Sequence, residues 1–163
     1  MPKLYLDTNV IVKRYIEEKG SESVRQIFER SDTKELGICF SAWNVGEAIG
    51  VMDQYLRRGW ISEKQFGSAL GNLAGETLRL LRIEALELLP IGSSELAETW
   101  DLVRRHHIYQ GDALQLVTCA HTKADALVSA DKKLLEIAAQ EGIAAANIEN
   151  TKAISDLLDP STG

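Results

Sequence analysis

Cysteine and histidine are scarce in this chain of 163 residues, which contains only 2 Cys and 3 His. No histidine or second cysteine lies near Cys39 or Cys119 at the spacing of a zinc site, so we expect both cysteines to pack in the core. His106 and His107 follow two arginines in what we predict to be a solvated helix end. No feature of the sequence assigns catalysis to these two residues or to His121.

Long apolar runs are also missing. The chain has no run of about 18 apolar residues, the length at which a membrane-spanning helix is suspected. Asp7 interrupts the N-terminal segment before a long apolar run can develop. These features indicate neither a membrane span nor a secretory signal. We therefore expect a soluble protein of the cytoplasm that has no membrane partner.

Basic residues are fewer than acidic ones, with 18 Lys and Arg against 24 Asp and Glu and a net charge of −6. Such a balance argues at first against a nucleic-acid partner, because phosphate backbones attract basic surfaces. Clustered acids that hold divalent cations would weaken this objection, since the bound ions reverse the local charge. Four basic pairs remain for phosphate contacts, although we expect most to be solvated helix faces: Lys13-Arg14, Arg57-Arg58, Arg104-Arg105 and Lys132-Lys133.

The length and the apolar fraction of 45% suffice for a sizeable core. We expect a single domain over residues 1–158 and a frayed tail at 159–163. Strands and helices alternate, which predicts an α/β fold with three layers, α/β/α, around a central parallel sheet. The predicted strands are 3–6, 36–40, 86–91, 126–129 and 145–148. The predicted helices are 10–18, 21–30, 43–58, 62–81, 94–106, 112–123, 131–141 and 151–158.

Four acidic residues stand where strand ends or helix starts would bring them to one edge of that sheet. Asp7 and Asp131 each follow a short apolar run that reads as a strand. Glu47 lies about one turn into a helix that Ser41 is expected to cap, and Asp112 directly precedes an apolar-periodic run. Ligands of open α/β sheets bind outside the carboxyl ends of the strands, so a shared acidic site is predicted there.

Each acid also has a simpler explanation. Asp112 and Asp131 suit helix N-termini, where a carboxylate caps free N–H groups and complements the helix dipole. Glu47 is harder to explain in this way because its helical neighbours are apolar, and a half-buried glutamate needs a partner such as a cation. Those neighbours are Val45, Ala48, Ile49 and Val51.

The ligand types indicate which ion such a site would hold. Carboxylate oxygens suit Mg²⁺ or Mn²⁺, and a cluster without His or Cys argues against zinc or copper. We expect Asp7 and Asp112 to hold one ion with Asp131 as a further ligand and Glu47 beside it, and a second ion could arrive with the substrate. Three neighbours, Thr8, Asn9 and Ser129, could orient water or phosphate, but turn and capping roles suit them equally well.

Each of the four acids lies in a short segment with a recognisable pattern. These segments are Leu6-Asp7-Thr8-Asn9-Val10, Gly46-Glu47-Ala48, Gly111-Asp112-Ala113-Leu114-Gln115-Leu116 and Leu127-Val128-Ser129-Ala130-Asp131-Lys132-Lys133-Leu134. Together they resemble the PIN-domain family, and especially its VapC-like toxin ribonucleases. The order and context of all four acids match that family, and the resemblance spans roughly residues 3–150. One departure is Gln110-Gly111, where a bulkier apolar or aromatic residue is expected beside the acid.

The resemblance implies a metal-dependent endoribonuclease that hydrolyses RNA phosphodiester bonds, with catalytic and metal-binding roles for Asp7, Glu47, Asp112 and Asp131. It also implies a toxin of a toxin–antitoxin pair, hence a cognate antitoxin partner, and a homodimer. Residues 57–89 match no motif. The helical part of this segment has more apolar side chains than one buried helix face needs. They could form a dimer or partner surface, or they could pack within the subunit. These side chains are Phe66, Leu70, Leu73, Leu78, Leu81 and Ile83.

Two other functions have to be weighed against a nuclease. A non-catalytic module of the same fold could bind RNA or protein without cutting, although a scaffold has no evident need for four mutually repelling carboxylates. A phosphoacceptor receiver domain also places acids after strands. It fits poorly, because the paired acids near the first strand and the lysine after the last strand are missing from their usual contexts.

Overall fold

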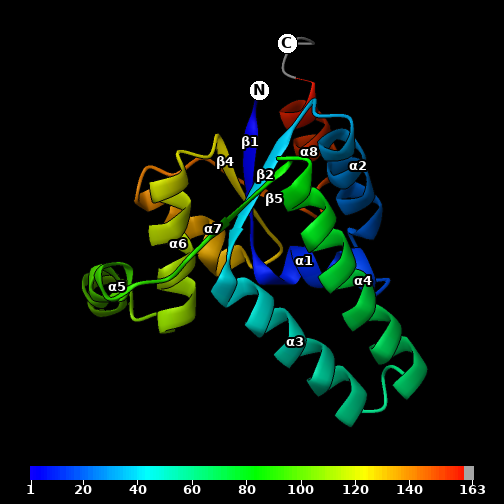
Figure 1. Ribbon diagram of the computed structural model, residues 1–163. Helices are drawn as coiled ribbons and strands as arrows, with labels where there is room; N and C mark the ends of the chain where they lie inside the picture. The colour runs from blue at the N-terminus through cyan, green and yellow to red at the C-terminus, as the bar shows by residue number, and fades with distance from the viewer. Residues whose placement is uncertain (160–163) are drawn as a thin grey trace.

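The computed structural model describes residues 1–159, so the predicted tail at 159–163 lies, from residue 160 onward, outside the described residues. Strands and helices alternate along the chain (Figure 1). The strands are β1 (Lys3–Leu6), β2 (Gly37–Ser41), β3 (Leu86–Leu89), β4 (Ala126–Ser129) and β5 (Ala145–Asn147). The helices are α1 (Thr8–Tyr15), α2 (Ser21–Asp32), α3 (Ala42–Arg57), α4 (Glu63–Arg82), α5 (Ser93–His106), α6 (Gln110–Thr122), α7 (Lys132–Gln140) and α8 (Thr151–Leu158).

The five strands form one parallel sheet in the order β3-β2-β1-β4-β5. β1 is central, because Leu4 pairs with Ile38 of β2 on one side and with Ala126 of β4 on the other. The chain builds outward from β1 through β2 to β3, then returns to start β4 on the opposite side. The carboxyl ends of β1 and β4 therefore flank a point where the winding direction reverses, and such a point is the usual place for a ligand in open α/β sheets.

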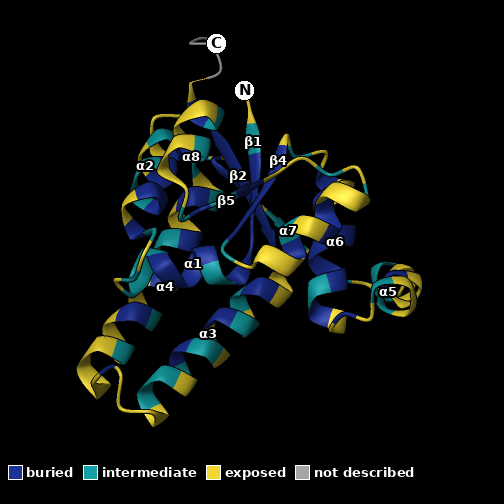
Figure 2. Cartoon of the chain, turned by 180° about the vertical axis from the view of Figure 1, so that it is seen from behind, coloured by how far each residue is buried: buried dark blue, intermediate teal, exposed yellow. Residues whose placement is uncertain are grey.

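Helices cover both faces of the sheet, as Figures 1 and 2 show from opposite sides. Alternate residues of β1 point to opposite faces: Leu4 and Leu6 join a core with α1, α2, α3, α4 and α8, whereas Tyr5 joins a core with α5, α6 and α7. The strands are apolar on both faces because both faces are covered. This arrangement confirms the predicted three-layer α/β/α fold.

Most elements begin or end within one or two residues of the predicted bounds, and the differences at β3 and α1 have an identifiable cause. β3 stops at Leu89 rather than at residue 91 because Pro90 has no N–H to extend the ladder. α1 begins at Thr8, since the carbonyl of Asp7 accepts hydrogen bonds from the N–H groups of Val10 and Ile11. It ends at Tyr15 rather than at residue 18.

A side chain from the next helix contributes to the early end of α1. The hydroxyl of Ser21 donates to the carbonyl of Lys13 at 2.8 Å, which satisfies one of the free groups at the end of α1. Ile16 already has an extended backbone. Gly20 precedes α2 with a φ of 93°, a conformation that glycine adopts without strain.

α3 and α4 form a long hairpin that extends past the carboxyl edge of the sheet (Figure 1). Capping boxes start both helices, Ser41 with Asn44 in α3 and Ser62 with Gln65 in α4. Most of the apolar side chains noted between residues 57 and 89 pack against the core of the subunit, and Leu78 is the exception with 63% exposure.

The helices described over residues 1–159 include none that combines the length and the apolar character needed to cross a membrane.

Candidate acidic site

Asp7, Glu47, Asp112 and Asp131 line one pocket of about 190 Å³ at the carboxyl edge of the sheet. These four acids come from four different elements: the end of β1, the second turn of α3, the first turn of α6 and the residue before α7. A fifth acid, Glu18, also lines the pocket but is paired with Lys13 at 3.1 Å. The structure thus brings together the four acids that the sequence singled out, although they lie up to 124 positions apart (131 − 7 = 124).

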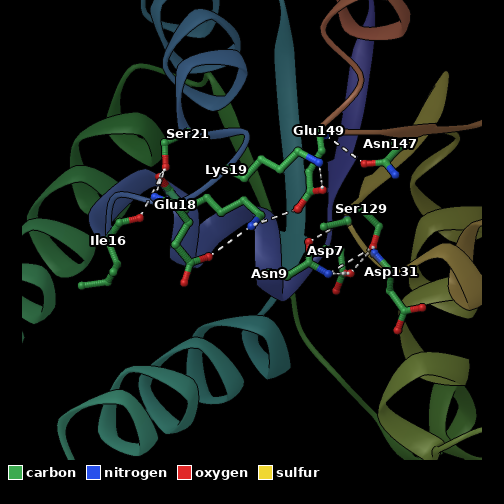
Figure 3. A network of polar contacts seen from close by, with 12 residues as sticks. Asp7, Asn9, Ile16, Glu18, Lys19, Ser21, Ser129, Asp131, Asn147 and Glu149 are labelled. Atoms are coloured by element: carbon green, nitrogen blue, oxygen red, sulfur yellow. Dashed lines mark hydrogen bonds and ion pairs between the residues drawn. The ribbon is translucent and has the colours of Figure 1, made fainter. Parts of the chain in front are cut away.

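Asp7 is the most deeply buried of these acids, with 3% exposure. One of its carboxylate oxygens, Oδ2, accepts hydrogen bonds from the Asn9 amide and the Ser129 hydroxyl (Figure 3). Burial raises the pKa of the Asp7 carboxyl to about 6, and the nearby charge of Glu47 acts in the same direction, while the bond from Ser129 opposes it. The Asp7 carboxylate is therefore costly to ionise in the absence of a cation.

Asn9 and Ser129 join the ends of β1 and β4. The side-chain oxygen Oδ1 of Asn9 accepts a hydrogen bond from the N–H of Ala130 at 2.9 Å, and the Ser129 hydroxyl oxygen accepts one from the N–H of Asp131 at 2.9 Å. Asn9 also donates to the Ser129 hydroxyl at 3.1 Å (Figure 3). These bonds link the chain segments that carry Asp7 and Asp131, which is the turn role that the sequence allowed for Asn9 and Ser129.

Asp112 lies in the first turn of α6 but does not cap it, because the helix begins at Gln110 and Tyr109 is the N-cap residue. Within residues 1–159, the Asp112 carboxylate has no hydrogen bond or ion pair. Burial, and after it the charges of Asp131, Asp7 and Glu47, raise the pKa of Asp112 to about 6. An acid whose pKa is shifted by three neighbouring carboxylates is a candidate functional residue.

Asp131 does cap a helix, as its simpler explanation predicts. Its Oδ1 accepts hydrogen bonds from the N–H groups of Lys133 at 2.8 Å and Leu134 at 3.1 Å. Both bonds use the same oxygen. The second carboxylate oxygen is left for the pocket, which Asp131 also lines.

The sequence suggested that Glu47 needs a partner, and in the structure a hydroxyl group is one such partner. Thr8 donates a hydrogen bond to its Oε2 at 2.6 Å. The Thr8 oxygen in turn accepts a hydrogen bond from the side-chain amide of Asn44 at 3.0 Å. The first turn of α1 and the second turn of α3 are thereby linked at the pocket wall.

Asn44 is the centre of a buried polar network that the sequence analysis missed. Its side-chain oxygen accepts from the Tyr5 hydroxyl and from the N–H and hydroxyl of Ser41, each at 2.8 Å. Its amide donates to Thr8 and, at 2.9 Å, to Gln115 of α6. The available sequence signals were the Ser41–Asn44 spacing of a capping box and a glutamine within the otherwise apolar stretch after Asp112.

Tyr109 explains the departure from the family pattern before Asp112. A Cβ atom added to Gly111 would lie 2.5 Å from Cε1 of the Tyr109 ring and 3.1 Å from Oε1 of Glu47. The ring therefore occupies the space that a side chain at position 111 would need. An aromatic ring therefore lies next to position 111, but it belongs to Tyr109, two residues earlier in the chain.

Most of the basic pairs noted in the sequence are engaged with acids. Lys13 is buried rather than solvated, whereas the others are partly or fully exposed. Lys132 and Lys133 have no ion pair within residues 1–159, and the charge of Lys133 lowers the pKa of Asp112. The ion pairs of the other three basic pairs include Lys13–Glu18 at 3.1 Å, Arg14–Glu76 at 2.7 Å, Arg57–Asp53 at 2.9 Å and Arg105–Glu141 at 2.7 Å.

The remaining scarce residues lie away from the pocket. Cys39 and Cys119 are buried free thiols, as predicted, and burial raises the pKa of each to about 12. His121 contacts Glu98 at 2.9 Å on the surface. His106 lies in the last turn of α5, but it is largely buried against Glu141 rather than solvated.

A larger hollow of about 440 Å³ lies beside α1 and α4. Its arginines are already paired, Arg14 with Glu76 at 2.7 Å and Arg79 with Asp32 at 2.8 Å. The smaller acidic pocket, whose charges repel one another, is the stronger candidate for a site.

The donor set of the acidic pocket fits a hard divalent cation. It offers carboxylate oxygens, which suit Mg²⁺ and Mn²⁺, and a cation would relieve the repulsion that raises the pKa of Asp112. Over residues 1–159, no group of three or more His, Cys, Asp or Glu side chains already converges on a single ion position. The carboxylates surround the pocket and would have to draw in around an ion.

Comparison with known proteins identifies the fold independently. The family model described as PIN domain matches residues 4–140. No curated protein sequence matches the chain.

Solved structures of similar shape come from bacterial and archaeal proteins. FitAcB from Neisseria gonorrhoeae has a TM-score of 0.63 at 18% identity, over 90% of this chain and 99% of that one. VapC20 from Mycobacterium tuberculosis, described as a Sarcin-Ricin loop cleaving toxin, has a TM-score of 0.61 at 11% identity, over 86% and 95%. PAE2754 from Pyrobaculum aerophilum has a TM-score of 0.62 at 15% identity, over 96% and 95%. At these identities the likeness concerns the fold.

Proposed function

Because the chain belongs to the PIN-domain family, we propose that it is a metal-dependent endoribonuclease that hydrolyses RNA phosphodiester bonds. One observation carries the proposal: four carboxylates from four separate elements line a single pocket at the reversal point of the sheet. A chain that only needed helix caps would not require Asp112, which caps nothing, or Glu47, which lies inside a helix.

Asp7, Glu47, Asp112 and Asp131 would hold the ion. When bound, Mg²⁺ or Mn²⁺ supplies positive charge that attracts the phosphate and eases deprotonation of a water molecule. With pKa values of about 6, Asp7 and Asp112 are mostly ionised at neutral pH and are available as ligands.

The surrounding side chains set the geometry of the acids. Ser129 and Asn9 orient one oxygen of Asp7, and Thr8 orients one oxygen of Glu47. Lys133, at the start of α7, is exposed beside the pocket and can contact a phosphate of the substrate. An acidic pocket with a neighbouring lysine is consistent with an RNA substrate despite the net charge of −6.

The biological setting that we propose is a toxin–antitoxin pair in the cytoplasm. This setting is supported by the family and by neighbours of similar fold, among them VapC20 and VapBC2 from Rickettsia felis. The VapBC2 structure contains a DNA fragment from its promoter. It has a TM-score of 0.56 at 17% identity, over 89% of this chain and 98% of that one. A small cognate antitoxin would then bind the chain and block cleavage, and the active form would be a homodimer. Expression of the chain alone should arrest growth, and co-expression of the antitoxin should relieve this arrest.

Substitution of one pocket acid tests the nuclease directly. Purified wild-type protein should cut labelled single-stranded RNA with Mg²⁺ or Mn²⁺ and not with a chelator, and Asp112→Asn should lose cleavage while it stays folded by circular dichroism. Asp156→Asn, an exposed acid on α8, makes the same chemical change outside the pocket and should cut like wild type. Equal cutting by all three proteins would point to a contaminant and refute the proposal.

A further inference from the structure

Two exposed aromatic side chains lie near Glu47. Trp43 is 39% exposed and Tyr109 is 61% exposed. Trp43 precedes Glu47 by one helical turn in α3, and the Tyr109 ring lies over Gly111, close to the Glu47 carboxylate. A single exposed aromatic residue is common at protein surfaces, but two beside the same acid of a pocket provide apolar surface of the kind that marks binding sites.

The surface of α3 beside Trp43 is hollow. Ala42, Trp43, Gly46 and Glu47 line a depression of about 390 Å³, within the range of about 300–1,000 Å³ usual for small-molecule clefts. A Cβ atom added to Gly46 would meet nothing within 4 Å. A planar group could therefore approach the helix backbone with its face or edge against the Trp43 ring.

Glu47 lines both this aromatic hollow and the acidic pocket. Under the proposed function, the scissile phosphate occupies the acidic pocket, so the base attached to that nucleotide or to its neighbour falls within reach of the aromatic hollow. A nucleobase is uncharged and planar. It suffers no repulsion from the acids and can stack on an aromatic ring, which a second phosphate could not do.

We propose that Trp43 and Tyr109 form a nucleobase subsite, which stacks an unpaired base of single-stranded RNA next to the phosphate that is cut. The proposal rests on the nuclease function and adds a base-binding subsite to it. Bases in a duplex are stacked on one another and cannot enter such a subsite without being flipped out. Gly111 belongs to the subsite indirectly, because any side chain there would displace the Tyr109 ring.

Binding measured without cleavage tests the subsite. The protein is Asp112→Asn in Mg²⁺ buffer, and the probe is a short single-stranded RNA that contains the fluorescent base 2-aminopurine. Adding Trp43→Ala or Tyr109→Ala should weaken binding about tenfold and reduce the quenching of the base, as expected for loss of one stacking contact. Trp43→Phe and Tyr109→Phe keep a ring and should retain most of the quenching.

Two further variants separate stacking from general damage. Trp60→Ala removes a tryptophan that is 62% exposed at the far end of α3, where it contacts Tyr55 and Arg58, and it should bind like the parent. Gly111→Ala should behave like Tyr109→Ala although it removes no ring. Thermal melts of each variant exclude unfolding as the cause of weaker binding.

The subsite and the nuclease can fail separately. If wild-type protein does not cut RNA but the alanine variants lose stacking, the subsite stands and the nuclease does not. If both alanine variants bind and quench like the parent, or the parent binds no RNA, the subsite is refuted whatever the cleavage result. If the alanine variants lose binding only to a protein that co-purifies with the chain, the surface is a protein interface, and the nucleobase subsite is also refuted.

Discussion

At the scale of single residues, Asp7 and Asp112 link the site to the stability of the fold. Both carboxyls have pKa values near 6 in the folded chain, against 3.8 for an ordinary aspartate. Folding therefore favours their protonated forms. Their contribution to stability is present in full below about pH 4 and is lost as the pH rises through about 6.

This sign predicts an unusual pH dependence in the absence of divalent cations. The free energy of unfolding should fall between about pH 5 and about pH 7.5, by on the order of 2 kcal/mol for the two groups together. Asp112→Asn, which cannot ionise, should show a shallower fall. Urea unfolding in chelator at several pH values measures this, and stability that is flat or rising over that interval would contradict the raised pKa values of Asp7 and Asp112.

A bound cation should offset the free-energy cost of ionising Asp7 and Asp112. At about pH 7.5, added Mg²⁺ or Mn²⁺ should raise the melting temperature of the wild-type protein, because a ligand that binds only the folded state stabilises it. The increase should be smaller for Asp112→Asn and normal for Asp156→Asn, which lies outside the pocket. Equal increases in all three proteins would place the ion elsewhere.

The four acids could be selected from sequence because each adjoins a recognisable strand end or helix start. Asn44 could not be recognised as the centre of a network, because its partners Tyr5, Thr8 and Gln115 are brought to it only by folding. The same limit applies to Tyr109. Sequence showed that Gly111 broke the family pattern, but only the structure shows which ring takes the space.

At the scale of elements, the start of α3 sets the position of Glu47. Asn44→Ala would remove a buried hydrogen bond from each of Tyr5, Thr8 and Gln115, and we expect a loss of roughly 2–4 kcal/mol in the free energy of unfolding. Gln65→Ala removes the equivalent capping residue from α4 at an exposed position and should cost no more than about 1 kcal/mol. Urea unfolding measures both losses. If the free energy of unfolding falls equally in the two variants, the buried network contributes no stability beyond that of the helix cap.

The bounds of an element were predictable where the local sequence determines them. β1 and β4 have the bounds predicted from their apolar runs, 3–6 and 126–129. The end of α1 was predicted wrongly, because the hydroxyl of Ser21 takes up the carbonyl of Lys13 and the backbone turns at Ile16. A contact with a residue beyond the helix cannot be inferred from the periodicity within it.

At the scale of the whole molecule, alternation of strands and helices was enough to predict a parallel sheet in three layers. It did not give the strand order, which places β1 between β2 and β4 and so joins the ends that carry Asp7 and Asp131. That order depends on the pairing of segments more than 100 positions apart, as in Leu4 with Ala126. The proposed convergence of four acids on one ion depends on it.

The cleavage rate of labelled single-stranded RNA as a function of Mg²⁺ concentration tests the central claim most directly, with wild type and Asp112→Asn compared under the same conditions. A rate that rises with Mg²⁺ and saturates for wild type, and is absent for a folded Asp112→Asn, is the predicted result. A rate that does not depend on the cation, or that survives the substitution, would contradict an acidic metal site as the source of activity.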